Sequence, residues 1–153
     1  MQLPGGLHIG KAAGIGGGSK IDCGRIIING GSITATGGNG AAGIGCGRGD
    51  SKVSPSCDGV TINGGTVVAK GGKNAAGIGA GNRGICGSIT IASTVTSVTA
   101  TKGEDAPYSI GKGINSSECG TITIGGMVYY DGAAFQNGGE TYLATSPLVY
   151  PAP

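Results

Sequence analysis

The sequence predicts an all-β protein, a parallel β-helix solenoid of about four coils with three short strands in each coil. Three observations lead to this prediction. Three short phrases recur in the same order four times, each phrase alternates apolar with small or polar residues, and 36 of the 153 residues are glycine. Glycine at this frequency disfavours helices, because each helix-interior glycine costs about 1 kcal/mol relative to alanine. A collagen helix is excluded because the glycines keep no Gly-X-Y period.

The first phrase places an isoleucine between two glycines. It reads Ala-Ala-Gly-Ile-Gly at residues 12–16, 41–45 and 75–79, and a shorter copy, Tyr-Ser-Ile-Gly, occupies residues 108–111. Glycine inside a strand-like phrase indicates a close approach of two backbones. We therefore expect the four isoleucines to stack on one face of the core, with little space between successive coils.

The second phrase begins with a cysteine and continues as a strand. Its copies start at Cys23, Cys57, Cys86 and Cys119, and each ends in an Ile/Val-x-Ile pattern. Alternation with a period of two is typical of a half-buried strand. The isoleucines and valines are expected to point inward, and the threonines and serines between them outward.

The third phrase reads Ile-Thr-Ala, Val-Val-Ala, Val-Thr-Ala and Val-Tyr-Tyr, at residues 33–35, 67–69, 98–100 and 128–130. Whole phrases that recur once per repeat are what vertical stacking requires, because each strand then pairs with its own copy about 4.8 Å away. Antiparallel blades are the alternative arrangement, but their hairpins require a two-residue turn at a fixed register. The pattern favours the parallel β-helix, and right-handed winding is expected for parallel crossovers.

Glycine-rich corners join the phrases, and some corner residues need a positive φ, which glycine adopts freely. Two of the corners read Asn-Gly-Gly, at residues 29–31 and 63–65. In a stacked arrangement Asn29 lies beneath Asn63, so we expect their side-chain amides to form a ladder.

We expect one domain with two parts, a repeat array at residues 1–126 and an irregular C-terminal capping segment at residues 127–153. The glycine repeats stop after Gly126, and four of the five tyrosines follow. A solenoid needs a terminal unit that covers its last coil. Residues 7–11 are expected to be a degenerate repeat copy. Residues 1–6 lack the basic start and apolar run of a signal peptide, so we expect a mature segment rather than a cytosolic chain.

Four of the five cysteines occupy the same repeat position and are predicted to form a column of small buried side chains. The fifth, Cys46, stands where the other copies have glycine, alanine or lysine. It brackets the longest insert together with Cys57, so a Cys46–Cys57 disulfide that closes this loop is the alternative to free thiols. A zinc site is not expected, because no two cysteines are two to four residues apart and His8 is the only histidine.

We expect no enzymatic activity, no cofactor and no metal. The eight carboxylates form no recurring pair on a strand face, and a nucleophile–base arrangement cannot be assembled around the single histidine. Charged residues make up 12% of the chain and the net charge is +2, so no basic patch points to nucleic acid. No run of 18 apolar residues exists, and membrane insertion is not expected either.

A binding site should use outward strand positions or corner loops, because the inward positions form the core. The corners between the third and first phrases vary most in chemistry, and the insert at residues 47–56 differs in length from its counterparts. Within it, Arg48-Gly49-Asp50 is the tripeptide that integrins read, with an ordinary polar loop as the alternative. The candidate contact residues are Arg48, Asp50, Lys52, Lys73, Asn74, Glu104 and Asp105.

The three phrases, followed by the tail from Val128-Tyr129-Tyr130 to Leu148-Val149-Tyr150, resemble the glycine-rich repeat regions of large surface proteins from gut Bacteroidetes and Firmicutes. Some of those proteins are described as adhesins or as carbohydrate-binding-domain proteins. The resemblance covers nearly the whole chain. It implies a parallel β-helix and an extracellular or cell-surface location.

The expected function is that of a non-enzymatic adhesin or carbohydrate-binding module, with a host or plant glycan or a host surface protein as partner. A spacer within a larger surface protein is an alternative. Ice binding is another, since a flat β-helix face can present an ordered Thr-x-Thr ladder. Partial ladders occur at Thr121-Ile122-Thr123 and Thr99-Ala100-Thr101. Both are broken, the first by Arg25 and Ile27 and the second by Val68 and Lys70.

Overall fold

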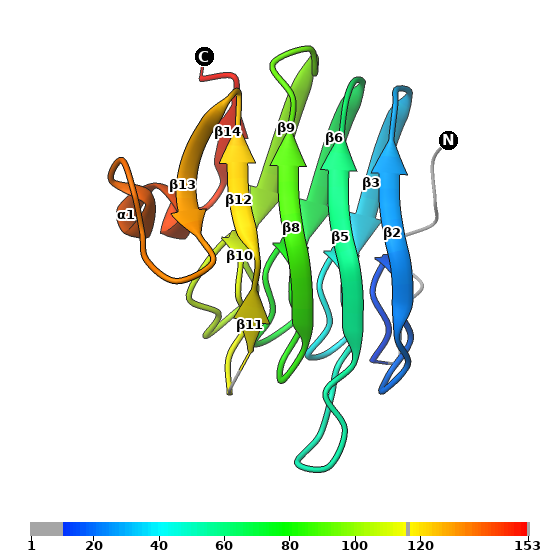
Figure 1. The fold of residues 1–153 in the computed structure, drawn as a ribbon. Coiled ribbons are helices and arrows are strands. Elements are labelled where there is room, and N and C mark those ends of the chain that lie inside the picture. The colour runs from blue at the N-terminus through cyan, green and yellow to red at the C-terminus, as the bar shows by residue number, and fades with distance from the viewer. Residues whose placement is uncertain (1–10, 116, 153) are drawn as a thin grey trace.

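The structure, a computed structural model, describes residues 11–115 and 117–152. The chain winds as a parallel β-solenoid whose three sheets form its faces (Figure 1). The predicted parallel β-helix is therefore confirmed. Residues 1–10, which include most of the expected degenerate repeat copy at residues 7–11, lie outside the described part of the chain.

The first sheet, called sheet A, consists of four two-residue strands that carry the Ile-Gly pairs. They are β1 (Ile15–Gly16), β4 (Ile44–Gly45), β7 (Ile78–Gly79) and β10 (Ile110–Gly111). All neighbours pair in parallel, and each isoleucine lies opposite the isoleucine of the next coil. The predicted isoleucine stack is confirmed.

Sheet B contains the cysteine-led strands. They are β2 (Cys23–Ile28), β5 (Ser56–Ile62), β8 (Ile85–Ile91), β11 (Glu118–Cys119) and β12 (Thr121–Ile124), and all of them pair in parallel. Four cysteines are aligned across the coils, as predicted, but the expected burial is wrong for Cys23, which lies in the end coil and is only half-buried. Residues that alternate along these strands are buried and solvent-facing in turn: Ile62 is fully buried while Ile27 is 56% exposed.

Sheet C contains β3 (Ser32–Thr36), β6 (Thr66–Lys70) and β9 (Ser97–Thr101), again in parallel register. Its buried positions repeat from coil to coil: an isoleucine or valine at Ile33, Val67 and Val98, and an alanine two residues later. The core is thus a stack of identical narrow layers.

The expected third strand of a fourth coil at residues 128–130 is wrong. Those residues belong to β13 (Met127–Asp131), which folds back and pairs antiparallel with β12 in sheet B. Gly125 and Gly126 join the two strands with φ values of 60° and 85°. Two consecutive positive φ angles are typical of the type I′ turn that closes a two-residue hairpin. The solenoid therefore has three complete coils and only the first two faces of a fourth.

The remaining C-terminal residues lie against this last partial coil (Figure 1). They form α1 (Gly139–Ala144) and β14 (Leu148–Tyr150), and β14 pairs antiparallel with β9 at the edge of sheet C. Leu143 and Leu148 are buried in the core cluster. Aromatic rings add to this packing, for example Tyr129 and Tyr142, whose centroids are 4.4 Å apart.

The corners are as regular as the strands. Asn63 donates its side-chain amide to the Asn29 side-chain oxygen at 2.9 Å, so the predicted amide ladder is confirmed. A second ladder joins Asn115 to Asn82 at 3.0 Å. Repetition of the backbone thus extends to polar side chains at the corners, which fixes the register of neighbouring coils.

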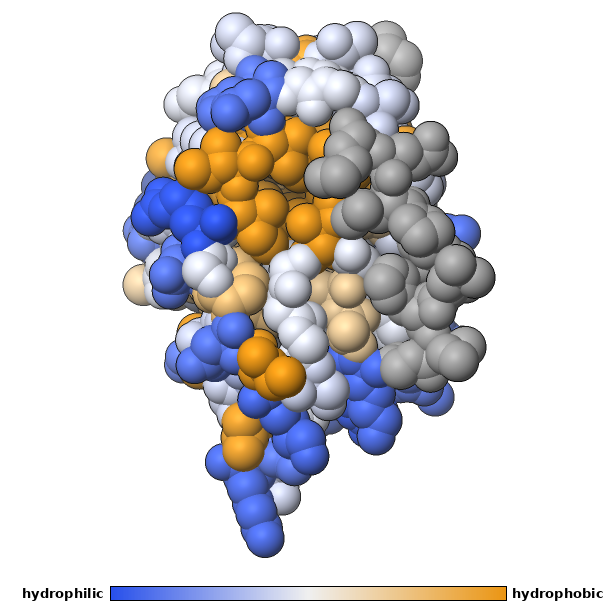
Figure 2. Space-filling view, turned by 90° about the vertical axis from the view of Figure 1, so that its right-hand side faces the viewer, coloured by the Kyte–Doolittle hydropathy of each residue, from blue (hydrophilic) through white to orange (hydrophobic). Residues whose placement is uncertain are grey.

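The first coil is the other end of the stack. Figure 2 looks at this end and shows apolar side chains gathered across it. Ile15 and Ile26 are partly buried there and pack against the core, whereas their counterparts in the second coil, Ile44 and Val60, are fully covered. Among the described residues, no helix has the length and apolar composition needed to cross a membrane.

Candidate binding site

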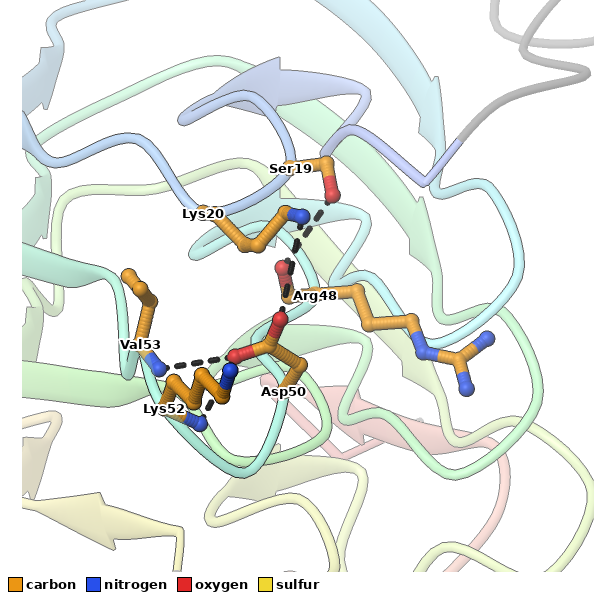
Figure 3. A network of polar contacts seen from close by, with 6 residues as sticks. All are labelled: Ser19, Lys20, Arg48, Asp50, Lys52 and Val53. Carbon is orange, nitrogen blue, oxygen red and sulfur yellow. Dashed lines mark hydrogen bonds and ion pairs between the residues drawn. The ribbon is translucent and has the colours of Figure 1, made fainter.

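The insert between β4 and β5 is folded around one carboxylate (Figure 3). Asp50 Oδ1 accepts the backbone N–H groups of Lys52 and Val53 at 2.8 and 2.7 Å. Asp50 Oδ2 lies 3.7 Å from the ammonium of Lys20, which comes from the coil below. The two backbone hydrogen bonds, helped by Lys20, lower the pKa of Asp50. The loop therefore has a defined shape despite its length.

This geometry bears on the Arg-Gly-Asp tripeptide. The Asp50 carboxylate is turned back onto its own loop and onto Lys20. The Arg48 guanidinium points away from it (Figure 3). This guanidinium donates to the Asn39 side-chain oxygen at 3.3 Å. The two charged side chains are thus engaged within the protein, and the ordinary polar loop is the better interpretation of the tripeptide.

A hollow of about 330 Å³ lies beside the insert. Three successive coils contribute to it through the corner that joins sheet A to sheet B, and Lys11, which precedes β1, adds to it from the first coil. Four of the lining residues carry a positive charge and one a negative charge. The lining residues are Lys11, Ser19, Lys20, Arg48, Gly49, Asp50, Ser51, Asn82 and Arg83.

Backbone hydrogen bonds between coils hold the walls of this hollow, which we call the basic hollow. The Lys20 N–H donates to Arg48 O at 2.9 Å, and the Gly49 N–H donates to Asn82 O at 2.9 Å. The Ser19 hydroxyl also donates to Arg48 O, at 3.4 Å. The charged side chains therefore project from a backbone that is already ordered.

The structure divides the predicted contact residues between two places. Arg48 and Asp50 line the basic hollow, and Lys52 contributes its backbone N–H to Asp50. The other predicted residues, at 73–74 and 104–105, lie at the corner between sheets C and A and do not line it.

The chemistry of this second corner follows largely from its backbone. Gly40, Asn74 and Asp105 occupy equivalent positions, and their φ values are 80°, 69° and 67°. Glycine, asparagine and aspartate are the residues that best tolerate this left-handed conformation. The Asn74 N–H donates to Glu104 O at 2.8 Å, so this corner also stacks from coil to coil. The residue types at this corner are therefore explained largely by its backbone conformation. Their variation from coil to coil is weaker evidence for a binding site than the sequence alone indicated.

Sequence reasoning missed the five lining residues that lie outside the insert, namely Lys11, Ser19, Lys20, Asn82 and Arg83. A signal for four of them was present. Counted from the glycine that ends the first phrase, Ser19-Lys20, Arg48-Gly49 and Asn82-Arg83 hold the same repeat positions. Alignment of the repeats at that glycine would have placed these polar residues in one column.

We expect Asp50→Asn to loosen the insert without unfolding the solenoid. An amide is a weaker acceptor than a carboxylate and carries no charge for Lys20. Hydrogen exchange at the Lys52 and Val53 amides should become at least several-fold faster, while the melting temperature stays within a few degrees. Asp58→Asn, at an exposed position on β5, is the matched control and should leave both amides unchanged.

The same contacts predict a pH dependence of the loop. The folded pKa of Asp50 is depressed below its ordinary value of 3.8. Protection of the two amides is therefore fully present above pH 3.8 and is lost as the pH falls through the folded pKa. Protection that disappears already at neutral pH would contradict this role of Asp50.

A second cluster lies in the interior and consists of thiols. The Sγ atoms of Cys46, Cys57 and Cys86 all lie within 4.8 Å of one another. All five cysteines are free, so the alternative of a Cys46–Cys57 disulfide is not what the structure contains. The neighbouring thiols of Cys46 and Cys86 lower the pKa of Cys57, and the neighbouring Cys57 raises the pKa of Cys46.

The cysteine spacing along the chain does not exclude a metal at this cluster. Cys57 and Cys86 are 29 residues apart in the sequence, yet they are direct neighbours in sheet B. Cys46 reaches them from the corner between sheets A and B. Stacking of coils can thus assemble a set of ligands that has no short spacing motif.

Comparison with known proteins supports the fold. A family model described as a beta helix repeat matches residues 26–48 and 60–82. Each matched segment runs from a strand of sheet B through sheet C to the corner after sheet A, which is one coil of the observed solenoid. No curated protein and no solved structure matches the chain. The repeat match and the parallel register of all three sheets agree that the protein is a parallel β-helix.

Proposed function

We propose that this β-helix is a non-enzymatic binding module of the adhesin type, at a cell surface, and that it recognises acidic carbohydrate through the basic hollow. The observation that carries the proposal is the hollow itself: four cations and one acid around about 330 Å³, on a corner that is ordered by backbone hydrogen bonds. A preorganised site binds with less loss of conformational entropy than a flexible loop does.

The chemistry of the lining fits a sugar that carries carboxylate or sulfate groups. Lys20 and Arg83 are side chains of the kind that pair with such anions. Ser19, Ser51 and the Asn82 amide add neutral polar groups, which suit sugar hydroxyls. Asp50 supplies an acceptor and limits the net charge, so the site is suited to a mixed polar ligand rather than to a bare polyanion.

The test is binding to two defined probes, an oligogalacturonate and a neutral oligosaccharide of the same length. We expect the wild-type protein to bind the oligogalacturonate, with an affinity that falls as salt is raised. The double variant Lys20→Ala/Arg83→Ala should bind at least tenfold more weakly, because hydrogen bonds to charged groups contribute about 1.5–3 kcal/mol each. Calorimetric titration measures both effects.

Arg25→Ala is the matched control, since it removes one exposed cation from the outward face of sheet B, away from the hollow. Its affinity should equal that of the wild type. Equal affinity of the double variant and the control would place the binding elsewhere on the molecule. Failure of the wild type to bind either probe would favour the spacer function.

Ice binding is the second candidate, because the structure aligns a threonine ladder on sheet B. Thr61, Thr90 and Thr123 are direct neighbours across three coils. Ile27 takes the same position in the first coil, and on sheet C Val68 and Lys70 interrupt the corresponding rows. A measurement of thermal hysteresis tests this function, and a ladder of this length predicts little activity.

A further inference from the structure

The three thiols that stacking brings together lie in the interior, outside the basic hollow. Cys57 and Cys86 are paired neighbours on β5 and β8, and each side chain is 2% exposed. Cys46, 1% exposed, points into the solenoid from the corner that precedes the insert, and its thiol donates to Ile85 O at 3.0 Å. Three sulfur atoms therefore face a common point in a buried site.

We propose that Cys46, Cys57 and Cys86 form a binding site for one soft, thiophilic cation, with Cu(I) as the ion that fits best. Thiolate sulfur is the ligand type that selects soft ions such as Cu(I) and zinc over harder ions. The group consists of three sulfur donors, without a carboxylate or an imidazole among the described residues. A structural zinc site is almost always tetrahedral and needs a fourth ligand, whereas a set of soft sulfur ligands alone suits Cu(I).

The separation of the sulfurs suits one ion. An ion at the centre of a triangle whose sides are at most 4.8 Å lies no more than about 2.8 Å from each sulfur. A metal–thiolate bond is about 2.3 Å long. Each sulfur thus has to move inward by at most about half an ångström, a distance within reach of side-chain torsions.

Binding is a ligand exchange with a simple balance. Each thiol that binds as a thiolate releases one proton to solvent, the copper stays Cu(I), and no electron is transferred. One member of the triad borders an open hollow. This hollow, of about 310 Å³, is lined by Cys86 and Cys119, together with Lys112 and Glu118. An ion that enters it meets Cys86 first.

The repeat itself offers a variant that keeps the fold. Ala80 holds the position of Cys46 in the next coil and is fully buried there. Cys46→Ala therefore places in the second coil the residue that the third coil already has. Cys23→Ala is the matched control, because Cys23 belongs to the same column but lies outside the triad.

The experiment is an anaerobic titration of the reduced, full chain with Cu(I) in competition with bicinchoninate, a coloured Cu(I) chelator. The wild type should take up one Cu(I) per chain, and X-ray absorption should show three sulfur ligands at about 2.3 Å. Cys46→Ala and Cys86→Ala should each lower the Cu(I) affinity by at least tenfold, and Cys23→Ala should leave it unchanged. Wild-type affinity in Cys46→Ala, or displacement of bound Cu(I) by an equimolar amount of Zn²⁺, would overturn the proposal.

The same sulfurs could instead be oxidised to a disulfide, and a thiol count separates the two chemistries. If the reduced protein takes up no Cu(I) in the presence of the chelator, while the air-exposed protein has lost two of its five thiols, the metal site is overturned in favour of a disulfide. Loss of one bound Cu(I) per chain on thiol alkylation, with the circular dichroism spectrum unchanged, supports the metal site.

Discussion

Ile62→Asp is expected to unfold the protein or to leave it only marginally folded. Ile62 is fully buried in the middle of the stack, between Ile28 and Ile91 of the neighbouring coils. The change removes a core side chain, which costs about 2–5 kcal/mol, and adds the penalty for burying a carboxyl group without a partner. The sum approaches the total stability of a typical domain, about 5–15 kcal/mol. Urea denaturation followed by circular dichroism measures the loss.

Thr61→Asp is the matched control, since it introduces the same group at the adjacent position of the same strand, on the outward side. It should cost far less than Ile62→Asp, because Thr61 is only half-buried and a carboxyl group at this position can reach solvent. The buried carboxyl of Ile62→Asp should have a raised pKa, because burial disfavours its charged form. Its destabilisation should therefore be largest above the pKa in the folded state and should decrease as the pH falls toward 4. Equal stability of the two variants would contradict the inward orientation of Ile62.

The columns of the solenoid could be predicted from the sequence because each phrase repeats almost unchanged. When Val60 and Ile62 of one copy correspond to Ile89 and Ile91 of the next, only parallel stacking in register buries all of them together. The Asn29–Asn63 ladder follows from the same argument, since equal position in the repeat becomes vertical neighbourhood. The repeats thus show which distant residues become neighbours in the fold, and a single sequence without repeats usually lacks this information.

The end of the array could not be predicted in the same way. The phrase at residues 128–130 has the spacing of a third strand, but Gly125-Gly126 follows Ile124 directly, without the asparagine that precedes Gly30-Gly31 and Gly64-Gly65. Both glycines take a positive φ and reverse the chain. A single residue therefore distinguishes a corner from a hairpin. The repeat pattern, which rests on whole phrases, does not detect a difference of one residue.

The thiol cluster was missed because it joins residues with different positions in the repeat, whereas the basic hollow was predicted in part, through Arg48 and Asp50 of the insert. The basic hollow combines the insert of the second coil with the corners of its neighbours, so it depends on the three-dimensional path of the corner. The thiol cluster joins Cys46, which follows the first phrase, to Cys57 and Cys86, which begin the second. Sheet A has only two residues per strand, and this short face brings such positions together.

Gly79→Ala is expected to be nearly as damaging as the loss of a core isoleucine. Gly79 has a φ of 133°, which an L-residue rarely adopts, and an added Cβ would overlap the carbonyl oxygen of Gly111 in the next coil. The strained backbone alone costs about 1–3 kcal/mol, and relief of the overlap would require two paired coils to separate. We expect a fall in melting temperature of more than about 10 °C, since about 1 kcal/mol corresponds to a few degrees in a domain of this size.

Gly30→Ala is the control, because no atom lies within 4 Å of its added Cβ. The added methyl group also reduces the freedom of the unfolded chain, so this variant should be as stable as the wild type or slightly more stable. Equal melting temperatures for the two variants would show that the coils can move apart at sheet A, contrary to the close backbone contact on which the stacking of its Ile-Gly strands depends.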